Sequence, residues 1–179
     1  IHSDVFGPTT TPSIGGSRYY VPFTDDFSRY SWIYFIKSKS DVFDKFREFK
    51  TLIENQLGRK IKTLRTDNGG EFCSDKFDKF CVDTGIARQK TIRYTPQQNG
   101  VSERLNRTLL ERARCMLSWA RLGAEFWAEA VATTGYLKNR TPTKTVRGQH
   151  TYEVVVGKKP NLTNSGVFVG DAFSNVPQE

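Results

Sequence analysis

Three acidic residues have side chains that could act together. One lies inside an expected strand, and the other two lie at the boundaries of expected elements. Asp4 lies inside an expected first strand over 1–6. Asp67 follows an expected strand over 61–66, and Glu103 lies in the first turn of a long expected helix. A strand, a strand end and a helix start can converge on one edge of a sheet. Because magnesium prefers oxygen ligands, these carboxylates are candidates for a metal-dependent site.

Each of the three acids also has a purely structural explanation. Asp4 could be a solvated strand residue, and Glu103 could pair with the dipole at the start of its helix. Asp67 begins an Asp-Asn-Gly sequence, which is a strong turn signal by itself. The adjacent Asp25 and Asp26 lie at an expected hairpin turn, which favours a structural role. Residue types alone leave both explanations of the three acids open.

The periodicity of apolar residues predicts an α/β chain. Aromatic and β-branched stretches predict strands over 1–6, 18–25, 30–37, 61–66 and 87–92. Apolar residues that recur every three or four positions predict helices over 38–57, 74–84, 101–123 and 124–140. A hairpin followed by a crossover helix and further strands implies a mixed sheet with helices on its faces. Ser40 is the expected N-cap of the first helix, and 94–100 is an expected loop.

The charge of the chain favours a polyanionic partner. The 179 residues are enough for one domain, and they carry a net charge of +8 with a pI near 9.5. Eight basic residues and two acids lie between positions 85 and 121, a pattern typical of phosphate contacts, with a solvated helix face as the alternative. The apolar runs are too short for a membrane span, and the three cysteines and two histidines lack zinc-site spacing. We expect a soluble, intracellular protein in which Cys73, Cys81 and Cys115 serve as small apolar residues.

Several sequence blocks together resemble a known family. Asp67 and Glu103 have 35 residues between them, and their flanks read TDNGGEF and TPQQNGVSERLNRTL. With IHSDVFGP around Asp4, these blocks are similar to the Asp, Asp, Glu triad of retroviral and retrotransposon integrases. Further blocks bring the resemblance closest to copia-type (Pseudoviridae-like) long-terminal-repeat retrotransposons, over about 1–163: FTDDFSRYSWIYFIKSKSD, FCVDTGI, ERARCML, FWAEAVATTGYLKNRTP and GKKPNL. The family implies a ribonuclease-H-like fold, in which a five-stranded mixed sheet is flanked by helices.

The resemblance implies a polynucleotidyl transferase of the Asp-Asp-Glu type. Water as the nucleophile would trim the 3′ ends of retrotransposon cDNA, and a freed 3′-hydroxyl would join them to target DNA by in-line phosphoryl transfer. Two Mg²⁺ ions, replaceable by Mn²⁺, would be held with Asp4 bridging both, Asp67 on one and Glu103 on the other. Glu71, which follows two glycines close to Asp67, is a candidate supporting group.

The same resemblance implies contacts with double-stranded DNA around the acids. A loop before the long helix would position DNA ends, and the basic helix would contact phosphates with little sequence preference. The expected DNA-binding residues are Gln97, Gln98, Asn99, Arg104, Arg107 and Arg114. Asn68 and Gly69 would shape the turn at Asp67, with Gly100 and Asn106 as further supporting residues. We expect a homodimer or higher multimer that contacts no membrane, in the nucleus during integration and in cytoplasmic virus-like particles before it.

The C-terminal part departs from the family pattern. We expect a catalytic core over 1–145 and a divergent extension over 146–179, which contains the apolar run at 154–156. The zinc module that precedes this core in the family, and the DNA-binding region that follows it, are not recognisable in the sequence. Two other functions stay open. One is a catalytically silent, domesticated DNA-binding or scaffold module. The other is a related nuclease or Holliday-junction resolvase, which the 35-residue spacing disfavours.

Overall fold

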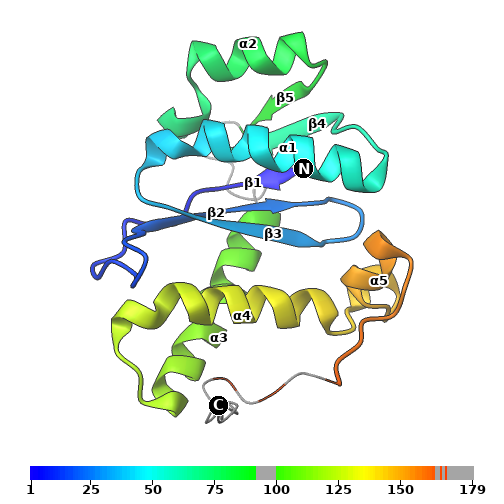
Figure 1. The fold of residues 1–179 in the computed structure, drawn as a ribbon. Helices are drawn as coiled ribbons and strands as arrows, with labels where there is room; N and C mark the ends of the chain where they lie inside the picture. The colour runs from blue at the N-terminus through cyan, green and yellow to red at the C-terminus, as the bar shows by residue number, and fades with distance from the viewer. Residues whose placement is uncertain (92–99, 164–165, 167, 169–179) are drawn as a thin grey trace, which may run out of the picture.

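A five-stranded mixed sheet runs through the middle of the computed structural model, which describes residues 1–91, 100–163, 166 and 168 (Figure 1). The strands are β1 (His2–Ser3), β2 (Tyr19–Thr24), β3 (Ser31–Ile36), β4 (Thr63–Thr66) and β5 (Ala87–Lys90). Their order across the sheet is β3-β2-β1-β4-β5. β2 pairs antiparallel with β1 and β3, whereas β4 pairs parallel with β1 and β5. The predicted mixed sheet is therefore confirmed.

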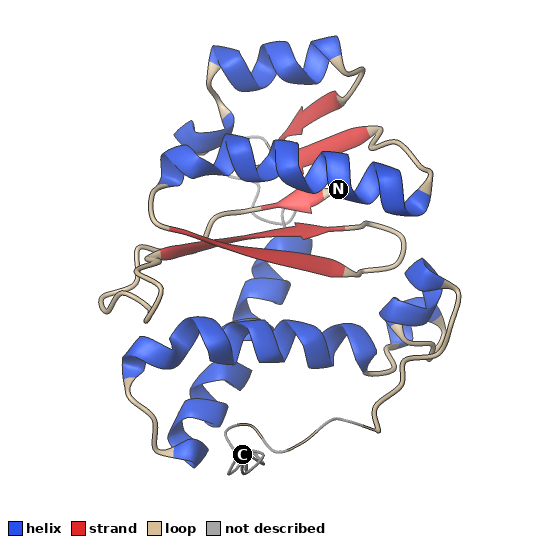
Figure 2. Ribbon diagram, in the orientation of Figure 1, coloured by secondary structure: helices blue, strands red, loops and turns tan. Residues whose placement is uncertain are grey.

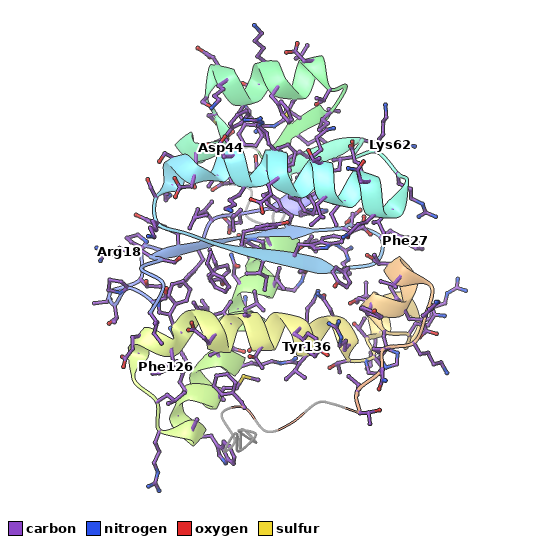
Figure 3. The ribbon with its side chains drawn as sticks, in the orientation of Figure 1. Arg18, Phe27, Asp44, Lys62, Phe126 and Tyr136 are labelled. Carbon is purple, nitrogen blue, oxygen red and sulfur yellow. The ribbon has the colours of Figure 1, made fainter. Side chains whose placement is uncertain are left out.

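Helices cover both faces of this sheet (Figure 2). The helices are α1 (Val42–Leu57), α2 (Asp75–Asp83), α3 (Gly100–Ala120), α4 (Trp127–Arg140) and α5 (Thr151–Val156). One buried cluster joins Phe23 and Leu64 of the sheet to α1 and α2, and a second joins Tyr20 to α3 and α4. Figure 3 shows side chains filling the space on both sides of the sheet. The chain thus has a sheet between two helical layers, as the α/β prediction requires.

The first long helix begins at a capping box that does not use the expected Ser40. A 3-10 turn over Lys39–Asp41 precedes α1, and Ser38 is its N-cap. The Ser38 hydroxyl accepts a hydrogen bond from the Ser40 N–H, and the Asp41 carboxylate accepts one from the Ser38 N–H over 3.0 Å. The prediction of Ser40 as N-cap is wrong because Asp41 lies three residues after Ser38, the spacing that a reciprocal capping box needs.

The first strand is shorter than predicted. β1 ends at Ser3, so Asp4 lies directly after the strand instead of inside it. After β1, this segment pairs with β2 through an isolated antiparallel bridge between Phe6 and Tyr20. The end of β1 therefore leaves the Asp4 side chain at the edge where the parallel strand β4 also ends.

Other boundaries also differ from the prediction. Gly100 is the first residue of α3, so it is helical and does not belong to the expected loop. The expected helix over 124–140 starts with a 3-10 turn over Ala124–Phe126 before α4 begins. The apolar run at 154–156 lies in α5, which the weak C-terminal pattern did not predict. The Thr151 hydroxyl donates to the backbone carbonyl of Asn139 over 3.0 Å, which joins α5 to α4.

The tip of the β2–β3 hairpin is built by the two aspartates that were expected to be structural. Oδ2 of Asp25 accepts hydrogen bonds from both the backbone N–H and the hydroxyl of Ser28, each over 2.7 Å. Oδ1 of Asp26 lies 2.9 Å from Nε2 of His2 and accepts from the Arg29 guanidinium over 2.9 Å. These contacts confirm the structural role, and they tie the hairpin tip to β1.

The three cysteines do not share one environment. Cys81 is buried within α2, whereas Cys73 and Cys115 are exposed. The expectation of an apolar role is wrong for these two, because Cys73 lies in the turn before α2 and Cys115 on the outer side of α3. Among the helices of the described residues, none is both long enough and apolar enough to cross a bilayer.

Candidate active site

Asp4 is held at the end of β1 by one backbone and one side-chain donor. Its Oδ1 accepts a hydrogen bond from the Val5 N–H over 2.9 Å. Its Oδ2 accepts one from Nδ2 of Asn106 over 3.1 Å. Asn106 is 8% exposed and lies two turns into α3, so this helix orients the half-buried carboxylate of Asp4.

Asp67 follows β4 directly and forms the turn that its sequence predicted. Its Oδ1 accepts a hydrogen bond from the Gly69 N–H over 3.0 Å, while Nδ2 of Asn68 donates to the Thr91 carbonyl over 2.8 Å. A Cβ at Gly69 would lie 2.9 Å from the carboxylate of Glu71, so that carboxylate would have to shift. The hydrogen bonds of Asn68 and Gly69 both belong to the segment that follows Asp67. Among the described residues, the second oxygen of Asp67 accepts no hydrogen bond.

The ends of β1 and β4 bring several carboxylates into one electrostatic environment. Burial is the largest cause that raises the pKa of Asp4 to about 6, and the negative charge of Asp67 is the next. The Val5 hydrogen bond opposes this rise in pKa, while the charges of Glu71 and Glu103 add to it. Since the parallel neighbours β1 and β4 end at the same edge of the sheet, Asp4 and Asp67 both lie there, and the charge of Glu103 on α3 also acts on Asp4.

Glu103 occupies the expected first turn of α3 but remains exposed. Within 1–91, 100–163, 166 and 168, no three His, Cys, Asp or Glu side chains form a group that could hold a metal ion as placed. The donors themselves fit a hard divalent cation, because Asp4, Asp67 and Glu103 supply only carboxylate oxygens. Two buried polar atoms, Oδ1 of Asn106 and Oγ of Ser102, also lack a hydrogen-bond partner among the described residues.

Glu71 lies beside this group but already has a positively charged partner. Its side chain is 7% exposed, and its Oε1 accepts from Nζ of Lys39 over 3.1 Å. Lys39 therefore compensates the charge of this nearly buried carboxylate. The sequence contained no signal for Lys39, because it lies 32 residues before Glu71 in the turn that starts α1.

The expected DNA-binding residues divide into two groups. Arg104, Arg107 and Arg114 are exposed on α3, and none of them forms an ion pair with an acid in the described part of the chain. The predicted contacts Gln97, Gln98 and Asn99 lie outside the described residues. With Glu111 and Arg112, α3 therefore carries two acids and four arginines, and none of these arginines forms an ion pair among the described residues.

The fold and the position of the acids define a recognisable class. A solved structure, the cryo-EM structure of the simian T-cell lymphotropic virus intasome in complex with PP2A regulatory subunit B56 gamma, superposes with a TM-score of 0.66 at 18% sequence identity. The match covers 98% of this chain and 59% of the other chain. The mixed sheet and its flanking helices are thus a ribonuclease-H-like fold, as expected.

The family follows from the sequence comparisons. The family model described as Integrase core domain matches residues 1–96, and the chain belongs to this family. It is 45% identical over all 179 residues to the Retrovirus-related Pol polyprotein from transposon TNT 1-94 of Nicotiana tabacum, and 39% identical over 168 residues to that from transposon RE2 of Arabidopsis thaliana. These matches cover 100% and 94% of this chain but 14% and 11% of the two relatives. The resemblance to copia-type integrase cores is therefore confirmed.

Proposed function

We propose that this chain is the catalytic core of a metal-dependent integrase that trims the 3′ ends of retrotransposon cDNA and joins them to target DNA. The observation that carries the proposal is the electrostatic convergence at Asp4, whose pKa is raised to about 6 by burial and by the charges of Asp67, Glu71 and Glu103. Repelling carboxylates at one sheet edge are costly unless a cation joins them. Membership of the integrase core domain family supports the same function.

Asp4, Asp67 and Glu103 are the residues that would hold the metal. Mg²⁺ is the expected ion and Mn²⁺ a substitute. When bound, such a pair of ions stabilises the attacking and leaving oxygens of an in-line phosphoryl transfer. Glu71 would stay outside the metal shell, because Lys39 already compensates its charge.

The remaining residues of the site would position groups. Asn106 orients the Asp4 carboxylate through its 3.1 Å hydrogen bond, and the Gly69 N–H fixes one oxygen of Asp67. Arg104, Arg107 and Arg114, together with 97–99, would bind the phosphates of double-stranded DNA with little sequence preference. Assembly into a homodimer or higher multimer, and action in the nucleus after assembly in cytoplasmic particles, belong to the same proposal.

A strand-transfer assay tests the proposal. The protein is incubated with a branched oligonucleotide in Mg²⁺ or Mn²⁺, and joining or its reversal is followed on a gel. We expect activity in the wild type and a loss of at least about 100-fold in Asp67→Asn and Glu103→Gln, because transition-state charge loses its stabilisation. Asp83→Asn, at an exposed acid that ends α2, is the matched control and should keep full activity. Equal activity in the wild type and Asp67→Asn would refute the assignment.

A second function is favoured by one observation. Glu103 does not form a metal-binding group with the other acids as placed, which is what a catalytically silent DNA-binding or scaffold module would display. Salt-dependent DNA binding without metal-dependent cleavage or joining in either ion would support this alternative. A calorimetric titration separates the two functions, because only the integrase is expected to bind Mn²⁺ in a manner that Asp67→Asn abolishes.

A further inference from the structure

A hollow of about 510 Å³ lies between the first turns of α3 and the C-terminal end of α4. Its lining contains four cationic side chains and, among the described residues, no carboxylate. The cationic residues are Arg29, Arg104, Arg112 and Lys138. Six threonines account for most of the remaining lining, so the hollow contains hydroxyl groups as well as positive charges. This composition suits a phosphate-bearing ligand.

Lys138 is a partly buried cation of this hollow, and it forms no ion pair with an acid among the described residues. Its ammonium donates to the backbone carbonyl of Arg29 and, over 2.9 Å, to the hydroxyl of Ser31, which are both neutral acceptors. Burial, and after it the positive charges of Arg29 and Arg112, lower its pKa to about 8. A buried ammonium surrounded by further cations is costly unless an anion joins it.

A second hollow, of about 550 Å³, continues from the first. Arg29, Val101 and Arg104 line both, and the second is also lined by Arg65 and Lys90. The one carboxylate in its lining, Asp26, is already bonded to His2 and Arg29. The two hollows therefore form one cationic path around the start of α3.

The second hollow adjoins the candidate active site. His2 and Arg65 line it and face each other across β1 and β4. They precede by two residues Asp4 and Asp67, which follow the ends of β1 and β4. The cationic path therefore leads toward the end of the sheet where the carboxylates lie.

We propose that this path binds the sugar-phosphate backbone of one DNA strand, with Arg112 and Lys138 contacting phosphates remote from the reacting bond. The proposal rests on the integrase function proposed above and adds Arg29, Arg65, Arg112 and Lys138 to its DNA contacts. A strand is favoured over a small anion because the cations extend through two joined hollows instead of surrounding one point. A line of phosphates can satisfy all of them at once.

The experiment measures DNA binding without catalysis. Asp67→Asn protein in EDTA is titrated into a labelled duplex with a single-stranded end at several salt concentrations. In this background, Arg112→Gln/Lys138→Gln is compared with Lys37→Gln/Lys79→Gln, which removes the same charge from two exposed lysines outside both hollows. We expect the first pair to lower affinity by about 10-fold and to reduce the salt slope by roughly 1–2, since each lost phosphate contact removes about 0.9. The control pair should leave both quantities unchanged.

Three results would overturn the proposal. The first is an unchanged affinity and salt slope in Arg112→Gln/Lys138→Gln. The second is an equal loss in the control pair, which would indicate nonspecific charge. The third is tripolyphosphate raising the melting temperature of the parent protein but not of Arg112→Gln/Lys138→Gln while DNA affinity stays the same, which would indicate a small-anion site. If the double variant does not fold, the same measurement is made on Arg112→Gln alone, because Arg112 is exposed and its replacement should not disturb the fold. The readout needs no metal, so it does not depend on the outcome of the strand-transfer assay.

Discussion

The side-chain amide of Asn106 donates to Oδ2 of Asp4 over 3.1 Å, and this bond joins α3 to the end of β1 across 102 positions of sequence. The helix that carries Glu103 is therefore tied directly to the acid at the centre of the site. Asn106→Leu keeps the volume but removes the donor, and we expect it to lower the free energy of unfolding by about 1–2 kcal/mol. Urea unfolding measures the change. Asn55→Leu, at an exposed position of α1, should change stability by less than about 0.5 kcal/mol. Equal effects of the two substitutions would show that the bond to Asp4 contributes nothing.

The two glycines after Asn68 provide a second prediction. Gly69→Ala places a Cβ 2.9 Å from the Glu71 carboxylate, so this carboxylate, which pairs with Lys39, must shift. We expect a loss of about 1 kcal/mol in stability and a fall in strand-transfer rate. At Gly70 a Cβ would meet no atom within 4 Å, which makes Gly70→Ala the matched control. The prediction fails if both alanines behave alike in thermal melting and in the joining assay.

At the start of α1, we expect Ser38 and Ser40 to contribute differently to the stability of the protein. Ser38→Ala removes the side-chain acceptor of the capping box and should cost about 1 kcal/mol. Ser40→Ala removes a hydroxyl that donates to the Ser38 hydroxyl on the exposed surface, so a smaller loss is expected. Urea denaturation of the two variants decides between them, and a larger loss at Ser40 would restore the cap predicted from sequence.

Lys138 predicts a pH dependence of stability. Its pKa in the folded protein is about 8, below the ordinary lysine value of 10.5, because of burial and then the charges of Arg29 and Arg112. The unfolded chain therefore binds more protons between these two values, and stability from this group rises as the pH increases through the window. Below about pH 8 both states are protonated and the cost of burying the charge is fully present.

Lys138→Met isolates this contribution, because other groups titrate equally in both proteins. The stability of the wild type relative to Lys138→Met should increase by about 1–2 kcal/mol between pH 7 and pH 9.5. Urea unfolding of both proteins at both pH values measures how the stability difference between them changes with pH. A difference that stays constant, or that decreases with pH, would mean that Lys138 does not hold a buried charge.

The periodicity of apolar residues predicted most of the helices and strands, because the buried face of each element depends on residues close together in sequence. Phe43, Phe46, Phe49 and Ile53 recur at helical spacing, and all four are buried on the inner side of α1. The meeting of acids at one edge could also be predicted, because neighbouring parallel strands must end together and Asp67 follows β4 directly.

The parts that sequence did not predict depend on contacts between distant positions. Lys39 pairs with Glu71 across 32 positions, and Lys138 reaches the Arg29 carbonyl across 109. Neither lysine lies in a distinctive motif, so only the folded chain identifies which charge is compensated. The choice of Ser40 over Ser38 failed for a different reason, since both serines precede the same apolar pattern and only the Asp41 hydrogen bond separates them.

Glu103 and Arg104 are consecutive residues on the first turn of α3, yet they belong to opposite charge environments. The charge of Glu103 acts on Asp4, while Arg104 lines both cationic hollows. Any rotation of this turn about the helix axis displaces both side chains together. In the proposed function, capture of a cation and alignment of a nucleic-acid strand would therefore be one mechanical event, and moving this turn to change one would also change the other.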